Sequence, residues 1–146
     1  MRILFVCTGN TCRSPMAKYL LENLISQNNG NPIEVLSAGI GAHLPSPISS
    51  HASALLSEKH IDASSHQALL FTPDLVDETT VVLTMGASHK ANILSRYPFL
   101  SGRVHTLAEY VNCTGDIADP FGNSLDVYRI CFMQLEKLIT KLYLQI

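Results

Sequence analysis

Hydrophobic residues gather in four short runs along the chain. They cover residues 2–6 (RILFV), 33–39 (IEVLSAG), 79–85 (TTVVLTM) and 103–107 (RVHTL). Nearly continuous apolar runs of this length are typical of strands buried on both faces of a parallel sheet. We therefore predict four strands, with the connecting segments on the two sides of the sheet.

The segments that follow the first three strands contain residues at helical spacing. Ser14 can cap the first helix and Pro15 suits its first position, and the helix is expected to end near residues 28–32. Shorter helices are predicted over residues 51–59 and 87–97.

The end of the chain predicts one long amphipathic helix that Ser124 caps. Residues 43–50 and 108–123 are predicted to be loops. Strands and helices alternate, so we expect one α/β domain over residues 1–146: three layers, with a four-stranded parallel sheet and helices on both faces. The apolar stripe of the last helix consists of Leu125, Tyr128, Phe132, Leu135, Ile139 and Leu142.

Charge narrows the choice of partners. The 146 residues include 10 Lys and Arg against 12 Asp and Glu, for a net charge of -2. This argues against a broad basic surface for nucleic acid.

No apolar segment approaches the length that spans a bilayer, and the first run is too short for the core of a signal peptide. We expect a cytoplasmic monomer with no nucleic-acid or membrane partner.

The cysteines show no pattern of a metal or disulfide framework. Cys7, Cys12, Cys113 and Cys131 include no C-x-x-C pair and no zinc-ligand spacing. Cysteines of a reducing compartment usually stay free. We therefore expect no structural metal, and we interpret Cys113 and Cys131 as structural residues.

The segment CTGNTCRSP, residues 7–15, stands where the first strand meets the first helix. Its backbone N–H groups can turn inward and, with the helix N-terminus, form a cradle for an anion. Gly9 permits an unusual backbone shape, and Asn10 can hold the loop through side-chain hydrogen bonds. The Arg13 guanidinium can bind two phosphate oxygens. Because no GK[ST] follows, the loop is not a Walker-type phosphate loop.

Cys7 stands at the mouth of this cradle. Helix ends and nearby cations lower a cysteine pKa to roughly 3.5–7.5, so we expect a thiolate at neutral pH. Aimed at a bound phosphoryl group, that thiolate is an activated nucleophile. A cysteine at a strand end is more often a small buried hydrophobic residue, but the combination of Cys7 with Gly9, Asn10 and Arg13 favours a catalytic role.

Phosphoryl transfer also needs an acid for the leaving group. The candidates are Asp116 and Asp119 in the long loop before the last helix. Pro120 stiffens the backbone beside Asp119, although an Asp beside a Pro is more often a turn former.

These motifs together resemble the low-molecular-weight protein tyrosine phosphatases. The resemblance covers the whole chain and rests on CTGNTCRSP, on SAG (37–39) and on DPFG (119–122). It implies a metal-free and cofactor-free mechanism through a phosphocysteine on Cys7, with phosphorylated proteins as substrates. Arg13 would then stabilise the transition state, and Asp119 would act as general acid and then base.

The same resemblance assigns the supporting residues. Ser14 would hydrogen-bond the thiolate, Asn10 would shape the loop, and Ser37 and His66 would support them from behind. Cys12 would trap an oxidised Cys7 as a disulfide, or it simply packs under the loop. The substrate-binding residues would be Thr8, Gly9, Asn10, Thr11, Cys12, Ser14 and Phe121.

Two branches of this family differ in their substrates. Tyrosine phosphatases usually carry an apolar residue where Thr11 stands and frame the cleft with aromatic rings. Here residues 37–50 contain no aromatic ring of Phe, Tyr or Trp, and Gly122 follows Phe121. The chain resembles the bacterial protein arginine phosphatases more closely, because they share CTGNTCRSP and DPFG. A phosphoguanidinium needs hydrogen-bond acceptors near the phosphorus, and the Thr11 hydroxyl can be one of them. Phosphoarginine is therefore the predicted substrate, with phosphotyrosine as the alternative.

Two further hypotheses about the function have less support in the sequence. Arsenate reductases of this type relay electrons through two downstream cysteines, and no cysteine lies between residues 79 and 98. A phosphate-binding or redox-sensing module without turnover would not need Asp119.

Overall fold

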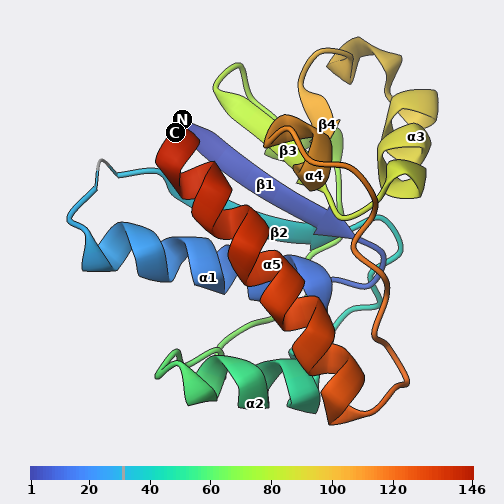
Figure 1. Ribbon diagram of the computed structural model, residues 1–146. Helices are drawn as coiled ribbons and strands as arrows, with labels where there is room; N and C mark the ends of the chain where they lie inside the picture. Colours follow the sequence, from blue (N-terminus) through green and yellow to red (C-terminus); the bar gives the residue numbers. More distant parts are fainter. Residues whose placement is uncertain (31) are drawn as a thin grey trace.

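A computed structural model describes residues 1–30 and 32–146. It contains a four-stranded sheet in which all pairs are parallel, in the order β2-β1-β3-β4 (Figure 1). The elements in chain order are β1 (Arg2–Cys7), α1 (Arg13–Gln27), β2 (Glu34–Gly39), α2 (Ser50–Glu58), a 3-10 turn (Pro73–Leu75), β3 (Thr80–Thr84), α3 (Ala87–Arg96), a 3-10 turn (Pro98–Leu100), β4 (Val104–Thr106), α4 (Leu107–Tyr110) and α5 (Leu125–Gln145).

The predicted three-layer α/β fold is confirmed, and β1 shows why the apolar runs indicated it. Ile3 and Phe5 point into a core shared with α1, α2 and α5, whereas Leu4 and Val6 point into a second core with α3. Side chains of a strand alternate between its two faces, so a strand covered on both faces is apolar throughout. Figure 1 shows α5 crossing in front of β1.

The helix predictions need two corrections. Ser14 does not cap α1: the helix begins at Arg13, Cys12 is its N-cap residue, and no side chain caps it. Within the predicted loop 108–123 the chain forms α4, because Thr106 and Glu109 make a reciprocal capping box. Ser124 does cap α5, since its Oγ accepts a hydrogen bond from the Val127 N–H.

Other boundaries differ slightly from the prediction. The helix α1 ends at Gln27, just before the predicted range of 28–32, of which residue 31 lies outside the described residues. The strand β4 is shorter than the apolar run and ends at Thr106, where α4 begins.

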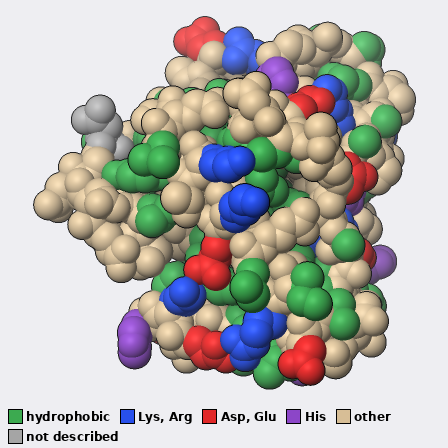
Figure 2. All heavy atoms as spheres, viewed as in Figure 1, with side chains coloured by type: hydrophobic (Ala, Val, Ile, Leu, Met, Phe, Trp, Pro, Cys, Tyr) green, Lys and Arg blue, Asp and Glu red, His purple; other side chains and the backbone are tan. Residues whose placement is uncertain are grey.

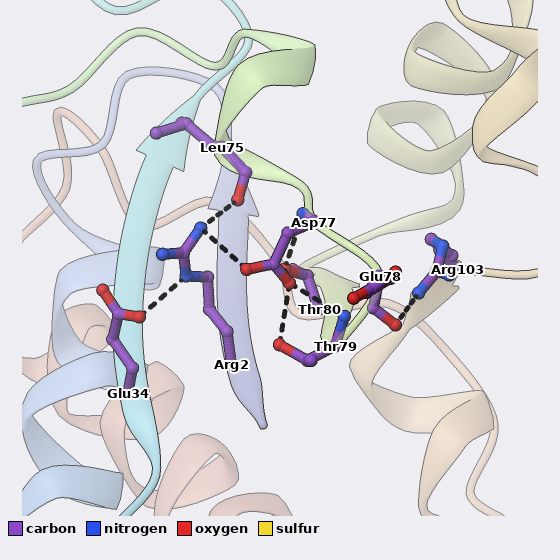
Figure 3. A network of polar contacts seen from close by, with 8 residues as sticks. All are labelled: Arg2, Glu34, Leu75, Asp77, Glu78, Thr79, Thr80 and Arg103. Carbon is purple, nitrogen blue, oxygen red and sulfur yellow. Dashed lines mark hydrogen bonds and ion pairs between the residues drawn. The ribbon is translucent and has the colours of Figure 1, made fainter.

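Polar contacts hold the edge of the sheet where the strands begin (Figure 3). Arg2 donates to the Glu34 carboxylate at 2.9 Å and to the Leu75 carbonyl at 2.9 Å. The Asp77 carboxylate accepts hydrogen bonds from the Thr79 N–H and from the Thr79 and Thr80 hydroxyls. These bonds lower the pKa of Asp77 to about 2. Because β1 begins at Arg2 and ends at Cys7, this network lies at the opposite end of the strand from Cys7.

The face that carries α5 has charges of both signs among hydrophobic side chains (Figure 2). Two ion pairs join α5 to α2 and to the residue that follows it: Arg129 with Glu58 at 2.8 Å, and Glu136 with Lys59 at 3.0 Å. Such exposed pairs contribute little stability individually. The packing of α2 and α5 therefore depends mainly on the hydrophobic side chains buried between them. Among the described residues, no helix is long and apolar enough to cross a membrane.

Candidate active site

The loop between β1 and α1 is pressed against the end of β2. The Ile40 and Gly41 N–H groups donate to the Cys7 and Thr8 carbonyls at 3.0 and 2.9 Å. A Cβ atom on Gly39 would collide with the backbone of Thr8, Gly9 and Asn10. Only glycine allows β2 to approach the loop this closely. The close approach explains why the SAG segment ends in glycine.

Asn10 holds the loop in shape from inside. It is fully buried and adopts a φ of 57°, in the left-handed region that Asn tolerates better than most residues. Its Nδ2 donates to Ser14 Oγ and its Oδ1 accepts from the Leu69 N–H, both at 2.8 Å. His66 Nε2 lies 2.8 Å from the Asn10 carbonyl. Asn10 therefore ties the loop to α1 and to the segment before β3.

Ser14 faces the sulfur of Cys7 at 2.9 Å. Because the Asn10 amide donates to Ser14 Oγ, the Ser14 hydroxyl keeps its own hydrogen for the sulfur at 2.9 Å or for the Ala38 carbonyl at 3.4 Å, and the sulfur is the nearer of the two. The Asn10 N–H also donates to Cys7 Sγ, at 3.3 Å. The local sequence thus brings two donors to one sulfur.

Cys7 lies inside the pocket rather than at its mouth, and its side chain is only 3% exposed. Burial raises the pKa of the Cys7 thiol above its ordinary value, against the lowering expected from the loop alone. The bonds from Ser14 and Asn10 and the charge of Arg13 oppose this increase, as does the positive end of α1. The thiolate at neutral pH depends on these groups and stays a prediction.

Arg13 connects the loop to the segment before α5. Its side chain is buried, and its Nη1 donates to the Ile117 carbonyl at 2.9 Å. Its Nη2 lies 3.7 Å from a carboxylate oxygen of Asp119. Asp119 is half exposed, and its other oxygen accepts from the Phe121 N–H at 3.0 Å. The fold therefore brings Asp119 next to the loop despite more than a hundred intervening residues.

Asp116, the other candidate acid, has a different position. Its carboxylate accepts from the Ala87 N–H at 3.0 Å and lies beside Gly86. It therefore binds the first turn of α3, and only Asp119 of the two lines the pocket.

A pocket of about 470 Å³ opens above the loop. Phe121 stands at its rim with 70% of its surface exposed. Among the predicted binding residues Asn10 and Ser14 lie beneath the pocket instead of lining it. The lining consists of Cys7, Thr8, Gly9, Thr11, Cys12, Arg13, Gly41, His43, Ser46, Asp119 and Phe121.

Of the remaining predicted residues, Cys12 lines the pocket, whereas His66 and Ser37 do not. Cys12 is buried, and its sulfur lies 3.2 Å from the Tyr128 hydroxyl and 3.7 Å from the Thr11 hydroxyl. His66 supports Asn10, as described above. Ser37 is buried in β2 beside Phe5, and none of the loop's side-chain hydrogen bonds in the described part of the chain involves it.

Sequence reasoning missed several residues of the site. His43, Ser46 and Gly41 come from the loop after β2, and no motif marks them. His89 of α3 contacts Thr8 from a position 81 residues away. Across residues 1–30 and 32–146, no group of three or more His, Cys, Asp or Glu side chains is placed to hold a metal ion.

Comparison with known proteins adds to this geometry. The family model described as "Low molecular weight phosphotyrosine protein phosphatase" matches residues 2–146. A protein-arginine-phosphatase of Geobacillus stearothermophilus is 48% identical over 97% of this chain and 93% of its own length. The low molecular weight protein-tyrosine-phosphatase PtpB of Staphylococcus haemolyticus is 38% identical over 97% of both chains.

A solved structure is also similar over nearly its whole length. It is a mutant of the YwlE arginine phosphatase with a phosphorylated active-site serine, and it superposes with a TM-score of 0.93 at 40% identity. The alignment covers 99% of this chain and 95% of that one.

Proposed function

The chain belongs to the low molecular weight phosphotyrosine protein phosphatase family, and we propose that it hydrolyses phosphoarginine in proteins through a phosphocysteine intermediate. The observation that carries the proposal is one pocket that Cys7, Arg13 and Asp119 line together, with Arg13 Nη2 3.7 Å from the Asp119 carboxylate. The substrate class is supported by the arginine phosphatase of G. stearothermophilus and by the Thr11 hydroxyl on the pocket wall.

In the first step the Cys7 thiolate attacks the phosphorus of the bound phosphoguanidinium. A sulfur–phosphorus bond forms as the phosphorus–nitrogen bond breaks. The leaving nitrogen takes a proton from the Asp119 carboxyl, so that arginine departs as its guanidinium cation and Asp119 is left as a carboxylate. Asp119 suits this role because it lines the pocket and remains half exposed to solvent.

In the second step water attacks the phosphocysteine. Asp119, now a carboxylate, takes the proton of that water, and the sulfur leaves as a thiolate. Ser14 and the Asn10 N–H hold the departing sulfur through the same bonds that hold Cys7 in the free protein. The products are inorganic phosphate and the original thiolate.

Arg13 stabilises the charge on the equatorial phosphate oxygens in both steps. Its Nη1 is fixed to the Ile117 carbonyl, which holds the guanidinium in place before substrate arrives. The remaining donors of the guanidinium and the backbone N–H groups of the loop, apart from the Asn10 N–H that donates to Cys7 Sγ, are the proposed donors to the phosphate.

The pocket wall favours phosphoarginine over phosphotyrosine. Thr11 and Ser46 are hydroxyl-bearing residues that line it, and Phe121 is its single phenyl ring. A guanidinium has several N–H donors that need acceptors, whereas a phenyl ring needs apolar contact. Phosphotyrosine remains the second candidate, because the S. haemolyticus relative is a tyrosine phosphatase and Phe121 can stack on a substrate ring.

The test compares kcat/KM for matched phosphoarginine and phosphotyrosine peptides in the wild type and in Thr11→Ile. The isoleucine removes a hydroxyl and adds apolar bulk, and both residues are β-branched, so the loop backbone should survive. Losing one hydrogen bond to the guanidinium costs about 1–3 kcal/mol, or about 5–150-fold in the ratio of the two rate constants. A ratio that does not change in the variant would contradict a role of Thr11 in substrate choice.

A second variant tests the catalytic proposal. Cys7→Ser should bind phosphate while its turnover of p-nitrophenyl phosphate is lost, because the loop and Arg13 remain and a serine hydroxyl is a far weaker nucleophile. Turnover close to that of the wild type would remove Cys7 from its role. A wild type that binds phosphate without any turnover would instead indicate a phosphate-binding module.

We further propose that the protein works in a reducing compartment such as the cytoplasm and that oxidation regulates it. All four cysteines are free in the structure, as expected for a protein of such a compartment. Cys7 and Cys12 both line the pocket, where a small oxidant can reach them.

A further inference from the structure

His89 lies against the phosphate loop without belonging to it. It is on α3, is 4% exposed, and its Nε2 lies 3.0 Å from the Thr8 hydroxyl oxygen. Its other ring nitrogen, Nδ1, is buried and has no hydrogen-bond partner; no other side-chain nitrogen or oxygen in the described residues shares this condition. A buried imidazole with one free nitrogen and one contact to a pocket residue needs an explanation.

The surroundings of the ring keep it neutral. Burial lowers the pKa of His89, and the nearby charge of Arg13 lowers it further. The carboxylates of Asp116 and Asp119 act in the opposite direction without reversing the shift. His89 therefore carries a single ring proton at neutral pH.

The unpaired Nδ1 decides where that proton sits. If Nδ1 carried it, a buried N–H would have no acceptor, which is rarer in proteins than an acceptor without a donor. With the proton on Nε2, the ring donates to Thr8 Oγ1 and only a lone pair remains unused. The donation occupies a lone pair of the Thr8 hydroxyl, and the hydroxyl hydrogen must turn to another acceptor.

We propose that His89 is a positioning residue that turns the Thr8 hydroxyl into a hydrogen-bond donor for the bound phosphate. Thr8 lines the pocket, directly after Cys7, and is exposed, so an oxygen of a phosphoryl group bound there is the acceptor that we assign to its hydroxyl hydrogen. His89 thus extends the set of donors around the anion beyond Arg13 and the loop backbone. The inference rests on the proposed function in taking this pocket as the phosphate site.

A double-mutant cycle between His89 and Thr8 tests this role. The measurement is the inhibition constant of inorganic phosphate against p-nitrophenyl phosphate, in Thr8→Val, His89→Leu and the double variant. A hydrogen bond to a charged group is worth about 1.5–3 kcal/mol, so Thr8→Val should weaken phosphate binding by about 10–150-fold. His89→Leu frees the hydroxyl to rotate and should weaken phosphate binding by a smaller factor, about 3–10-fold.

The decisive comparison is the effect of His89→Leu once the hydroxyl is gone. In the Thr8→Val background, His89→Leu should change the inhibition constant of phosphate by less than about twofold, because the hydroxyl that His89 positions is absent. His89→Gln should recover much of the loss, since its side-chain amide can donate from the place of Nε2. Equal losses from His89→Leu in both backgrounds, or no recovery with His89→Gln, would mean that His89 only packs α3, and would overturn the proposal.

A measurement on the wild type covers the case in which a variant does not fold. The ¹⁵N chemical shifts of the His89 ring report the tautomer, and we expect a proton on Nε2 and none on Nδ1 at neutral pH. A proton on Nδ1 would reverse the hydrogen bond and overturn the inference. If the wild type does not bind phosphate at all, the proposed function itself fails; if it binds and only the cycle is additive, the role of His89 alone fails.

Discussion

Replacing Asn10 by Ala should damage both the stability and the phosphate affinity of the protein. The change removes the hydrogen bonds to Ser14 and to the Leu69 N–H and places an Ala at a φ of 57°. Each lost bond costs about 1–3 kcal/mol, and the left-handed backbone costs a residue other than Gly or Asn about 1 kcal/mol more.

The structure indicates that each lost hydrogen bond costs an amount near the lower end of this range. Ser14 Oγ keeps Cys7 as a neighbour and Ala38 O as an acceptor, and the Leu69 N–H is only partly buried. We therefore expect a loss of about 3 kcal/mol in the free energy of unfolding, which corresponds to about 6–12 °C in Tm for a domain of this size. The loss is a large share of the total, because domains are stable by only about 5–15 kcal/mol.

Thermal unfolding and the inhibition constant of phosphate measure the two effects. The matched control is Asn112→Ala, because Asn112 has a similar φ of 61° but is exposed. It should lose only the backbone contribution of about 1 kcal/mol and leave phosphate binding unchanged. Equal losses of Tm in the two variants, with phosphate binding intact in both, would refute the idea that the Asn10 side chain holds the loop.

Three further outcomes are expected. Asp119→Asn should lower kcat by about 10²–10⁴-fold on substrates with poor leaving groups and less on p-nitrophenyl phosphate; that pattern in Asp116→Asn instead would identify the other carboxylate as the acid. Peroxide should inactivate the enzyme, and thiol reductant should restore it unless Cys12→Ser has removed the partner of Cys7; unchanged recovery in Cys12→Ser would leave Cys12 a packing residue. The Asp77 carboxylate, with its pKa lowered to about 2, should contribute stability above about pH 4 that is lost as pH falls through 2; the Tm difference between wild type and Asp77→Asn should therefore shrink with acidification, and a constant difference would contradict the linkage.

The sheet and the loop could be predicted from the sequence because both depend on local spacing. The apolar run of residues 2–6 matches a strand buried on both faces, and residues 7–13 join it directly to a helix. The short helix α4 carried a local signal that was overlooked: Thr106 and Glu109 have the spacing of a capping box.

Other features depend on contacts between distant parts of the chain. Ser14 looked like a cap because it precedes Pro15, but the loop curls so that its hydroxyl meets Cys7 instead. The contact of His89 with Thr8 could not be predicted from the residues around His89 in the sequence. It arises because β1 pairs with β3, which brings α3 next to Thr8. The pKa of Cys7 likewise depends on burial by elements far away in sequence.

The position of Thr11 has a consequence for how such enzymes diversify. Asn10, Ser14 and Arg13 are each bound into the fold by several contacts, whereas within residues 1–30 and 32–146 the Thr11 hydroxyl has one polar side-chain contact, 3.7 Å from Cys12 Sγ. On the proposed mechanism, a mutation at Thr11 therefore alters the wall that meets the leaving group and spares the residues that break the phosphorus–nitrogen bond. A duplicated gene can explore a new substrate at this position while its product still folds and still turns over phosphate esters. One scaffold can in this way give rise to lineages with different substrates, and the presence of both arginine and tyrosine phosphatases among the relatives of this chain is the outcome expected of it.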